Sequence, residues 1–135
     1  MTVADDNVDL VRKGYAAFAA GDLDALGEVM SPDVVHLAPG SNRTSGEYRG
    51  QEQVFGLYGM LFELSGGTFA IELVRAEAKG DDQVVARHHG TAKREDGETY
   101  EGDSTIVFTI VDGKATLLDE SHDDQAAVDA FWGPA

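Results

Sequence analysis

Residues 31–50 read S-P-D-V-V-H-L-A-P-G-S-N-R-T-S-G-E-Y-R-G. Two helical patterns precede this stretch, and a third helical pattern and then a long extended one follow it. The opening Ser-Pro-Asp is a turn signature, because proline fixes φ and the flanking polar side chains bond their own backbone. Val34–Ala38 follows as a short apolar strand, interrupted by His36. A Pro-Gly break and a polar loop lead to Gly50, where we expect a helix to begin. We expect this strand and loop to form the rim of a pocket.

Helical periodicity lies on both sides of this stretch. Residues 5–20 predict an amphipathic helix that Asp5 or Asp6 caps and Gly21 ends. Residues 23–30 predict a short second helix, and residues 51–64 a third. The predicted buried stripes are Val8, Val11, Tyr15 and Phe18 in the first helix and Val54, Leu57, Tyr58 and Leu61 in the third.

From Thr68 onward the apolar period changes to two, which is typical of strands. Strands are predicted over residues 68–78, 83–94, 98–111 and 114–121, separated by turns rich in Gly and Asp. Asp-Gly between alternating runs is a strong hairpin signal. After Asp123 or Asp124 we expect one or two last helical turns.

The order of elements indicates an α+β fold in a single domain, residues 1–135. A four-stranded antiparallel meander that bends around three helices makes a cone, closed at one end and open at its rim. Such a cone is a pocket for a small molecule.

The composition of the chain excludes several classes of binding partner and of metal site. The chain carries 25 Asp and Glu against 10 Lys and Arg, a formal net charge of −15. We therefore expect no nucleic-acid partner and no anionic membrane surface, since both need clustered basic residues. Cysteine is absent, which leaves no thiolate metal site. No apolar run approaches the ~20 residues that span a bilayer, and the first residues are acidic, so we expect a cytoplasmic protein.

Two segments carry a family resemblance. Residues 15–26 (YAAFAAGDLDAL) and 30–35 (MSPDVV) resemble the opening of nuclear transport factor 2-like proteins, in particular the SnoaL-like branch related to ketosteroid isomerases. Residues 46–50, 112–114 and 123–132 resemble further landmarks of that branch. The resemblance implies a cystatin-like α+β roll. It leaves the reaction open, because the family includes isomerases, polyketide cyclases, epoxide hydrolases, dehydratases and members of no known activity.

The residue set of ketosteroid isomerases carries over only in part. Their oxyanion tyrosine falls at Gly14, next to Tyr15, and their general-base aspartate falls at Ala38. Their protonated aspartate falls near Ile106, and only a supporting tyrosine has a match, Tyr58. Steroid isomerisation by that mechanism is therefore not expected.

An epoxide hydrolase of this fold would need an Asp–Arg–Asp set to orient and deprotonate water. The chain offers only Arg87 with Asp103 or Asp119, and no motif supports that set.

The candidate catalytic residues are His36, Asp119 and His89. A neutral imidazole at the mouth of a cone can act as a general base near pH 7, although a histidine in a strand can also be bonded only to its neighbours. Strand alternation turns one of His88 and His89 inward, and likewise one of Asp119 and Glu120. The family position that matches Asp119 is often a large aromatic, which favours Asp119 as the inward carboxylate. Adjacent histidines do not give ligands two apart on one face, so no metal is expected.

We expect an enzyme that works by general acid–base chemistry, without cofactor or metal, on a small apolar molecule; isomerase, cyclase, dehydratase and hydrolase reactions all stay open. The alternative is a non-catalytic ligand-binding or assembly module of the same fold. Residues 105–110 are apolar enough on both faces to indicate a homodimer packed through the sheet. The predicted substrate-binding residues are Tyr15, Phe18, Tyr58, Phe62, Arg87, Ser104, Phe108 and Trp132.

Overall fold

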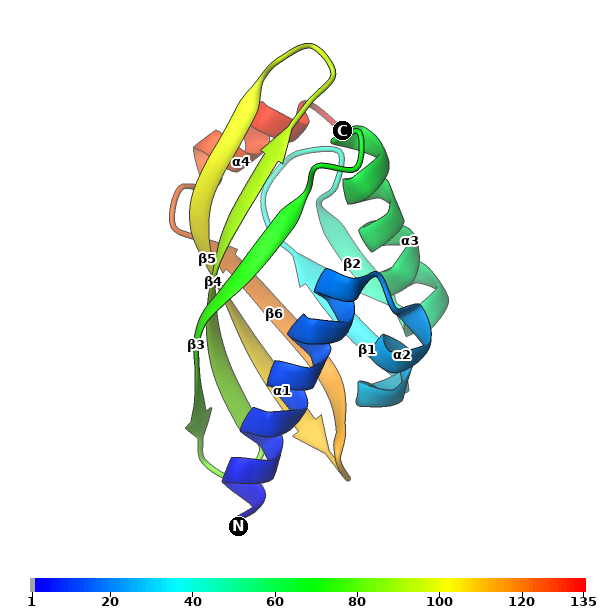
Figure 1. The fold of residues 1–135 in the computed structure, drawn as a ribbon, viewed down its shortest axis with the longest axis vertical. Coiled ribbons are helices and arrows are strands. Elements are labelled where there is room, and N and C mark those ends of the chain that lie inside the picture. The colour runs from blue at the N-terminus through cyan, green and yellow to red at the C-terminus, as the bar shows by residue number, and fades with distance from the viewer. Residues whose placement is uncertain (1) are drawn as a thin grey trace.

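A computed structural model describes residues 2–135 and contains four helices and six strands in that range. Figure 1 shows α1 across the concave side of a curved sheet, with α2 and α3 beside it. The elements in chain order are α1 (Val3–Ala20), α2 (Leu23–Val29), β1 (Met30–Ala38), β2 (Gly46–Arg49), α3 (Gly50–Leu64), β3 (Ala70–Lys79), β4 (Gln83–Lys93), β5 (Thr99–Val111), β6 (Lys114–His122) and α4 (Gln125–Trp132).

The strands form one sheet in the order β2-β1-β6-β5-β4-β3. Strands β3 to β6 are the predicted antiparallel meander, and each pairs with the next along the chain. β1 joins the sheet beside β6, in parallel. The sheet curves without closing and wraps around the helices (Figure 1), which confirms the predicted cone-shaped α+β roll.

Two local expectations need correction. The polar segment predicted as a loop contains β2, which pairs antiparallel with β1 through residues such as Tyr48, opposite His36. The first helix begins earlier than predicted and is capped by Thr2 rather than by Asp5 or Asp6. The Thr2 side chain accepts from the Asp5 backbone amide while the Asp5 carboxylate accepts from the amide of Thr2, which is a capping box.

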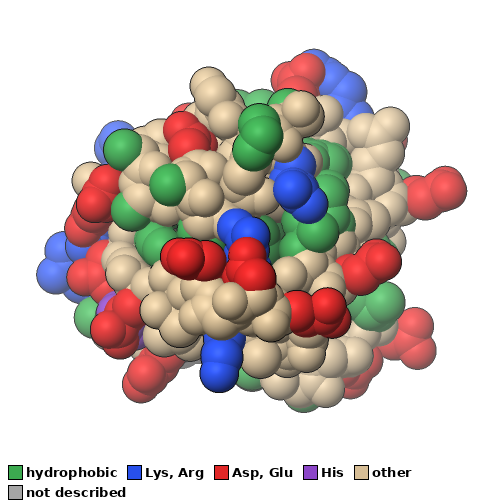
Figure 2. Space-filling model, turned by 90° about the horizontal axis from the view of Figure 1, so that it is seen from above, with side chains coloured by type: hydrophobic (Ala, Val, Ile, Leu, Met, Phe, Trp, Pro, Cys, Tyr) green, Lys and Arg blue, Asp and Glu red, His purple; other side chains and the backbone are tan. Residues whose placement is uncertain are grey.

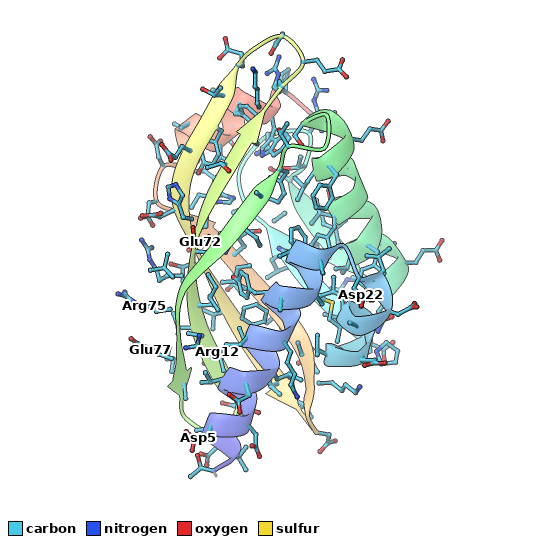
Figure 3. All side chains as sticks on the ribbon, in the orientation of Figure 1. Asp5, Arg12, Asp22, Glu72, Arg75 and Glu77 are labelled. Atoms are coloured by element: carbon cyan, nitrogen blue, oxygen red, sulfur yellow. The ribbon has the colours of Figure 1, made fainter. Side chains whose placement is uncertain are left out.

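The core lies between the concave face of the sheet and the helices. Most of the expected stripe residues of α1 and α3 are buried in it, while Val8, Phe18 and Leu61 are partly buried and pack against it. Val34, Val54 and Val84 are fully enclosed. Figure 3 shows side chains filling the space between α1 and the sheet, while Arg75 and Glu77 of β3 point away from the helices. A second cluster under α4 consists of Ala92, Val128, Phe131 and Trp132.

One carboxylate fixes the loop between β1 and β2. Asp129 of α4 accepts hydrogen bonds from the Ser41 amide (3.1 Å) and from the side-chain amides of Asn42 (2.8 Å) and Gln125 (2.9 Å). The chain reaches this contact through Gly40, whose φ is +91°. A Cβ on Gly40 would lie 2.1 Å from the Gln125 side-chain nitrogen and 2.3 Å from the Asp129 carboxylate.

We predict that Gly40→Ala lowers the free energy of unfolding by more than about 1 kcal/mol, because it adds a steric conflict to the cost of a positive φ. Gly113→Ala is the matched control, since its φ is +74° and its added Cβ meets no atom within 4 Å. Urea denaturation measures both. Equal losses in the two variants would show that the packing of the loop against α4 adds nothing.

Candidate functional site

A cavity opens between α1, α3 and the concave face of the sheet. Its volume is about 80 Å³, measured as the space available to the centre of a water molecule. Most of its wall is hydrocarbon, and five lining side chains can donate or accept hydrogen bonds. The apolar lining is Leu10, Val11, Gly14, Phe18, Leu26, Val29, Met30, Leu61, Phe69, Ile71, Ile106, Phe108, Ala115 and Leu118; the polar lining is Tyr15, His36, Tyr58, His88 and Glu120.

Three of these polar side chains form a continuous chain of hydrogen bonds. His36 Nε2 lies 2.9 Å from Glu120 Oε1, and His36 Nδ1 lies 2.9 Å from the Tyr58 hydroxyl. With His36 neutral, Tyr58 donates to Nδ1 and Nε2–H donates to the carboxylate. The parallel pairing that sets His36 beside Leu118 also brings it close to Glu120, two residues further along β6.

A second polar pair faces the same cavity. The Tyr15 hydroxyl of α1 lies 2.8 Å from His88 Nδ1 of β4, and both side chains are buried. When the proton sits on Nδ1, His88 donates to the Tyr15 oxygen and leaves the Tyr15 O–H free to donate to a third atom. The cavity therefore has a carboxylate acceptor on β6 and a hydroxyl donor on α1.

Burial and charge act on these groups in different directions. Burial would raise the pKa of the Glu120 carboxyl, but the hydrogen bond from His36 and the neighbouring histidines lower it below its ordinary value, so the group is ionised at neutral pH. Burial lowers the pKa of His88, which favours the neutral ring. Burial, and then the charge of Glu120, raise the pKa of both Tyr15 and Tyr58, which therefore keep their protons.

One oxygen of Glu120 is left available. Oε1 accepts from His36, whereas Oε2 accepts no hydrogen bond from any of residues 2–135. His122 Nε2 lies 3.9 Å from Oε2, which is beyond hydrogen-bond distance. An ionised carboxylate with a free oxygen, facing an apolar cavity, can accept a proton from a bound molecule.

The three predicted catalytic residues do not converge. His36 lines the cavity as expected, but the structure places Asp119 on the exposed side of β6. His89 lies on the outer face of the sheet, where its ring nitrogens bond to Asp103 (2.7 Å) and Glu101 (2.9 Å). The expectation that Asp119 and His89 face the cavity is therefore wrong.

Strand alternation gives the physical reason for the correction. Leu118 faces the core, so Glu120 faces inward and Asp119 outward. On β4, Val84 and Ala86 are buried, which turns His88 inward. The sequence offered both choices as adjacent pairs, and only the burial of the preceding apolar residues decides between them.

The predicted substrate-binding residues divide into two groups. Tyr15, Phe18, Tyr58 and Phe108 line the cavity.

The other four lie elsewhere. Phe62 is not one of the lining residues and stacks on Phe18, with ring centroids 5.5 Å apart. Arg87 forms a two-point ion pair with Asp123 (2.8 Å each). Ser104 bonds to His122, and Trp132 belongs to the cluster under α4.

Residues 2–135 contain no group of three or more His, Cys, Asp or Glu side chains arranged to hold a metal ion. No helix within that range is long and apolar enough to cross a membrane. Figure 2 shows acidic side chains spread around the end of the molecule viewed there, with basic ones between them.

We predict that ionised Glu120 stabilises the fold only above acid pH. Its pKa is lower in the folded chain than the ordinary 4.5, so this stability is present above 4.5 and is lost as the pH falls through the lowered value. The difference in unfolding free energy between wild type and Glu120→Gln should therefore shrink between about pH 6 and about pH 3. Asp119→Asn removes the same formal charge from the exposed side, and identical pH dependence of the two variants would contradict the assignment.

Comparisons with known proteins agree with this architecture. A family model described as a SnoaL-like domain matches residues 11–118. An uncharacterized protein of Mycobacterium tuberculosis, Rv0034, is 34% identical over 128 residues, which are 95% of this chain and 97% of that protein.

Solved structures extend the likeness to three dimensions. Bal32a, from a soil-derived mobile gene cassette, has a TM-score of 0.94 and 32% identity, covering 98% of this chain and 100% of its own. A protein of unknown function with a cystatin-like fold from Xanthomonas campestris has a TM-score of 0.87 and 32% identity, covering 98% and 99%. The chain belongs to the SnoaL-like family.

Proposed function

We propose that the protein is an enzyme that moves a proton on a small, uncharged, mostly apolar ketone, without a cofactor. The observation that carries this proposal is the His36–Glu120 pair, 2.9 Å between Nε2 and Oε1, in the wall of a mostly apolar cavity, with Glu120 Oε2 accepting no hydrogen bond from residues 2–135. The family setting supports it at a coarser level, since SnoaL-like proteins resemble cyclases and isomerases.

The lining of the cavity argues for the substrate class. Fourteen of its nineteen lining residues are apolar and none is Lys or Arg, so an anionic ligand would lose hydration without gaining a partner of opposite charge. The ionised Glu120 also disfavours an anionic ligand. A neutral ring with one polar oxygen can bury its carbon surface against Phe18 and Phe108 and present that oxygen to Tyr15.

Glu120 and Tyr15 have separate tasks in this reaction. Oε2 of Glu120 takes a proton from the carbon next to the carbonyl, and the electron pair of that C–H bond moves to the carbonyl oxygen as an enolate forms. Tyr15 donates its O–H to that oxygen, supported by the hydrogen bond from His88. Returning the proton at another carbon completes an isomerisation, whereas attack of the enolate carbon on a second carbonyl closes a ring.

His36 acts as a positioning residue in this proposal. Both of its nitrogens are bonded within the protein, to Tyr58 and to Glu120. Its hydrogen bond lowers the pKa of the carboxyl and engages Oε1, which leaves Oε2 without a hydrogen bond from residues 2–135. The same observation favours the second candidate function, a non-catalytic ligand-binding module, because no imidazole nitrogen of His36 is free for a ligand.

We predict that the wild-type protein accelerates conversion of cyclohex-3-enone to its conjugated isomer, followed by ultraviolet absorbance. Glu120→Gln should lower the rate by about 100-fold or more, because it removes the base while keeping the shape of the side chain. Asp119→Asn, on the exposed side of the same strand, should leave the rate unchanged.

Two other results would separate the candidate functions. If the ketone shifts the NMR signals of cavity residues but is not converted, the protein is a binding module. Equal rates for Glu120→Gln and wild type would remove Glu120 as the base.

A further inference from the structure

Glu120 has a second histidine beside it that the proposed reaction does not use. His122 Nε2 lies 3.9 Å from Glu120 Oε2, whereas His36 bonds to the other carboxylate oxygen, Oε1. The side chains of His122 and Glu120 are each 15% exposed, but His122, unlike Glu120, is not one of the residues that line the cavity. It lies one row further along the inner face of β6, toward α4. The carboxylate therefore lies between the cavity and a partly exposed imidazole.

Ser104 holds this imidazole in place. Its hydroxyl lies 2.6 Å from His122 Nδ1, directly across from it in the pairing of β5 with β6, and Ser104 is only 3% exposed. A hydroxyl can donate to a bare Nδ1 or accept from a protonated one. The contact therefore survives either charge state of His122, which is what a group that repeatedly gains and loses a proton requires.

We propose that His122 is a proton relay between the buried His36–Glu120 pair and solvent. A proton on Glu120 Oε2 passes to the unprotonated Nε2 of His122, whose Nδ1–H donates to Ser104. The carboxylate regains its charge and His122 becomes an imidazolium, which then gives a proton to water. Closing the 3.9 Å gap to hydrogen-bond distance takes a movement of about 1 Å.

The other groups around Glu120 do not provide this route. Tyr15 and Tyr58 keep their protons, and His36 has both nitrogens engaged. His88 lines the cavity, so its open side is covered once a ligand is bound. Only His122 has its exposure outside the cavity lining.

Charged groups of both signs lie around His122. The carboxylates of Asp123 and Asp129 both lie close enough to interact with His122 electrostatically, in addition to Glu120. His88 is the opposing neighbour, and burial keeps it neutral. Arg87 adds a positive charge, since it forms a two-point ion pair with Asp123.

The test measures proton exchange directly and needs no substrate. The ring N–H of His36 that donates to Glu120 is followed by NMR as it exchanges with solvent deuterium. We expect His122→Asn, which removes the titrating nitrogens but keeps an amide oxygen for Ser104, to slow this exchange by about 100-fold. In wild type the exchange rate should follow the titration of the His122 ring, and in the variant that pH dependence should disappear.

His89→Asn is the matched control, since it removes a histidine that is also bonded to carboxylates but lies on the outer face. It should leave the exchange rate as in wild type. If His122→Asn does not fold, His122→Gln takes its place, and Ser104→Ala should slow exchange less than either. Unchanged exchange and unchanged pH dependence in a folded His122 variant would overturn the relay.

The relay rests on the proposed function for its use in turnover, and a second readout keeps the two apart. In deuterated solvent, wild type should place deuterium in the isomerised ketone, whereas His122→Asn should return more of the original proton. A wild type that converts no ketone, with exchange still slowed by His122→Asn, would remove the function and keep the relay. Normal turnover, with the same deuterium content in the product of wild type and of His122→Asn, would remove the relay and keep the proposed function.

Discussion

The parallel pairing of β1 with β6 is the constraint on which the candidate site depends. It sets His36 beside Leu118 and brings the imidazole to 2.9 Å from Glu120. Burying an ionised carboxylate costs several kcal/mol unless a partner offsets the loss of hydration. Without His36 at this register, Glu120 would lose the hydrogen bond that lowers its pKa against the effect of burial.

Several groups then acquire their roles from that pair. Tyr58 of α3 completes the bonding of His36, while Tyr15 and His88 form a separate donor across the cavity. The apolar wall between them excludes water, so charge and hydrogen bonds act more strongly there than at the surface. The fold forms the cavity, and His36, His88 and Glu120 on the strands provide polar groups in its wall.

Much of the fold could be predicted from local patterns. The change from helical periodicity to alternation after residue 68 located the meander, and the resemblance around residues 15–35 identified the family. β2 escaped prediction because a four-residue edge strand in a Gly- and Ser-rich segment has no alternation to detect. Parallel pairing of β1 with β6 joins segments about eighty residues apart, and no local pattern encodes it.

The sequence predicted which strand positions lie near the site, but not which residue of each adjacent pair points into the cavity. His36 could be placed at the cavity, and each of the pairs His88-His89 and Asp119-Glu120 had to turn one member inward. Leu117-Leu118 precedes the carboxylates, and because both residues are apolar the sequence does not say which of them faces the core. The homodimer through the sheet stays a prediction.

A crystal structure with bound cyclohexanone tests the central claim most directly. The account predicts that the ring lies in the cavity against Phe18 and Phe108, with its oxygen within hydrogen-bond distance of Tyr15 and a carbon next to the carbonyl facing Glu120 Oε2. A cavity filled by side chains, or a ring bound only outside it, would contradict the account.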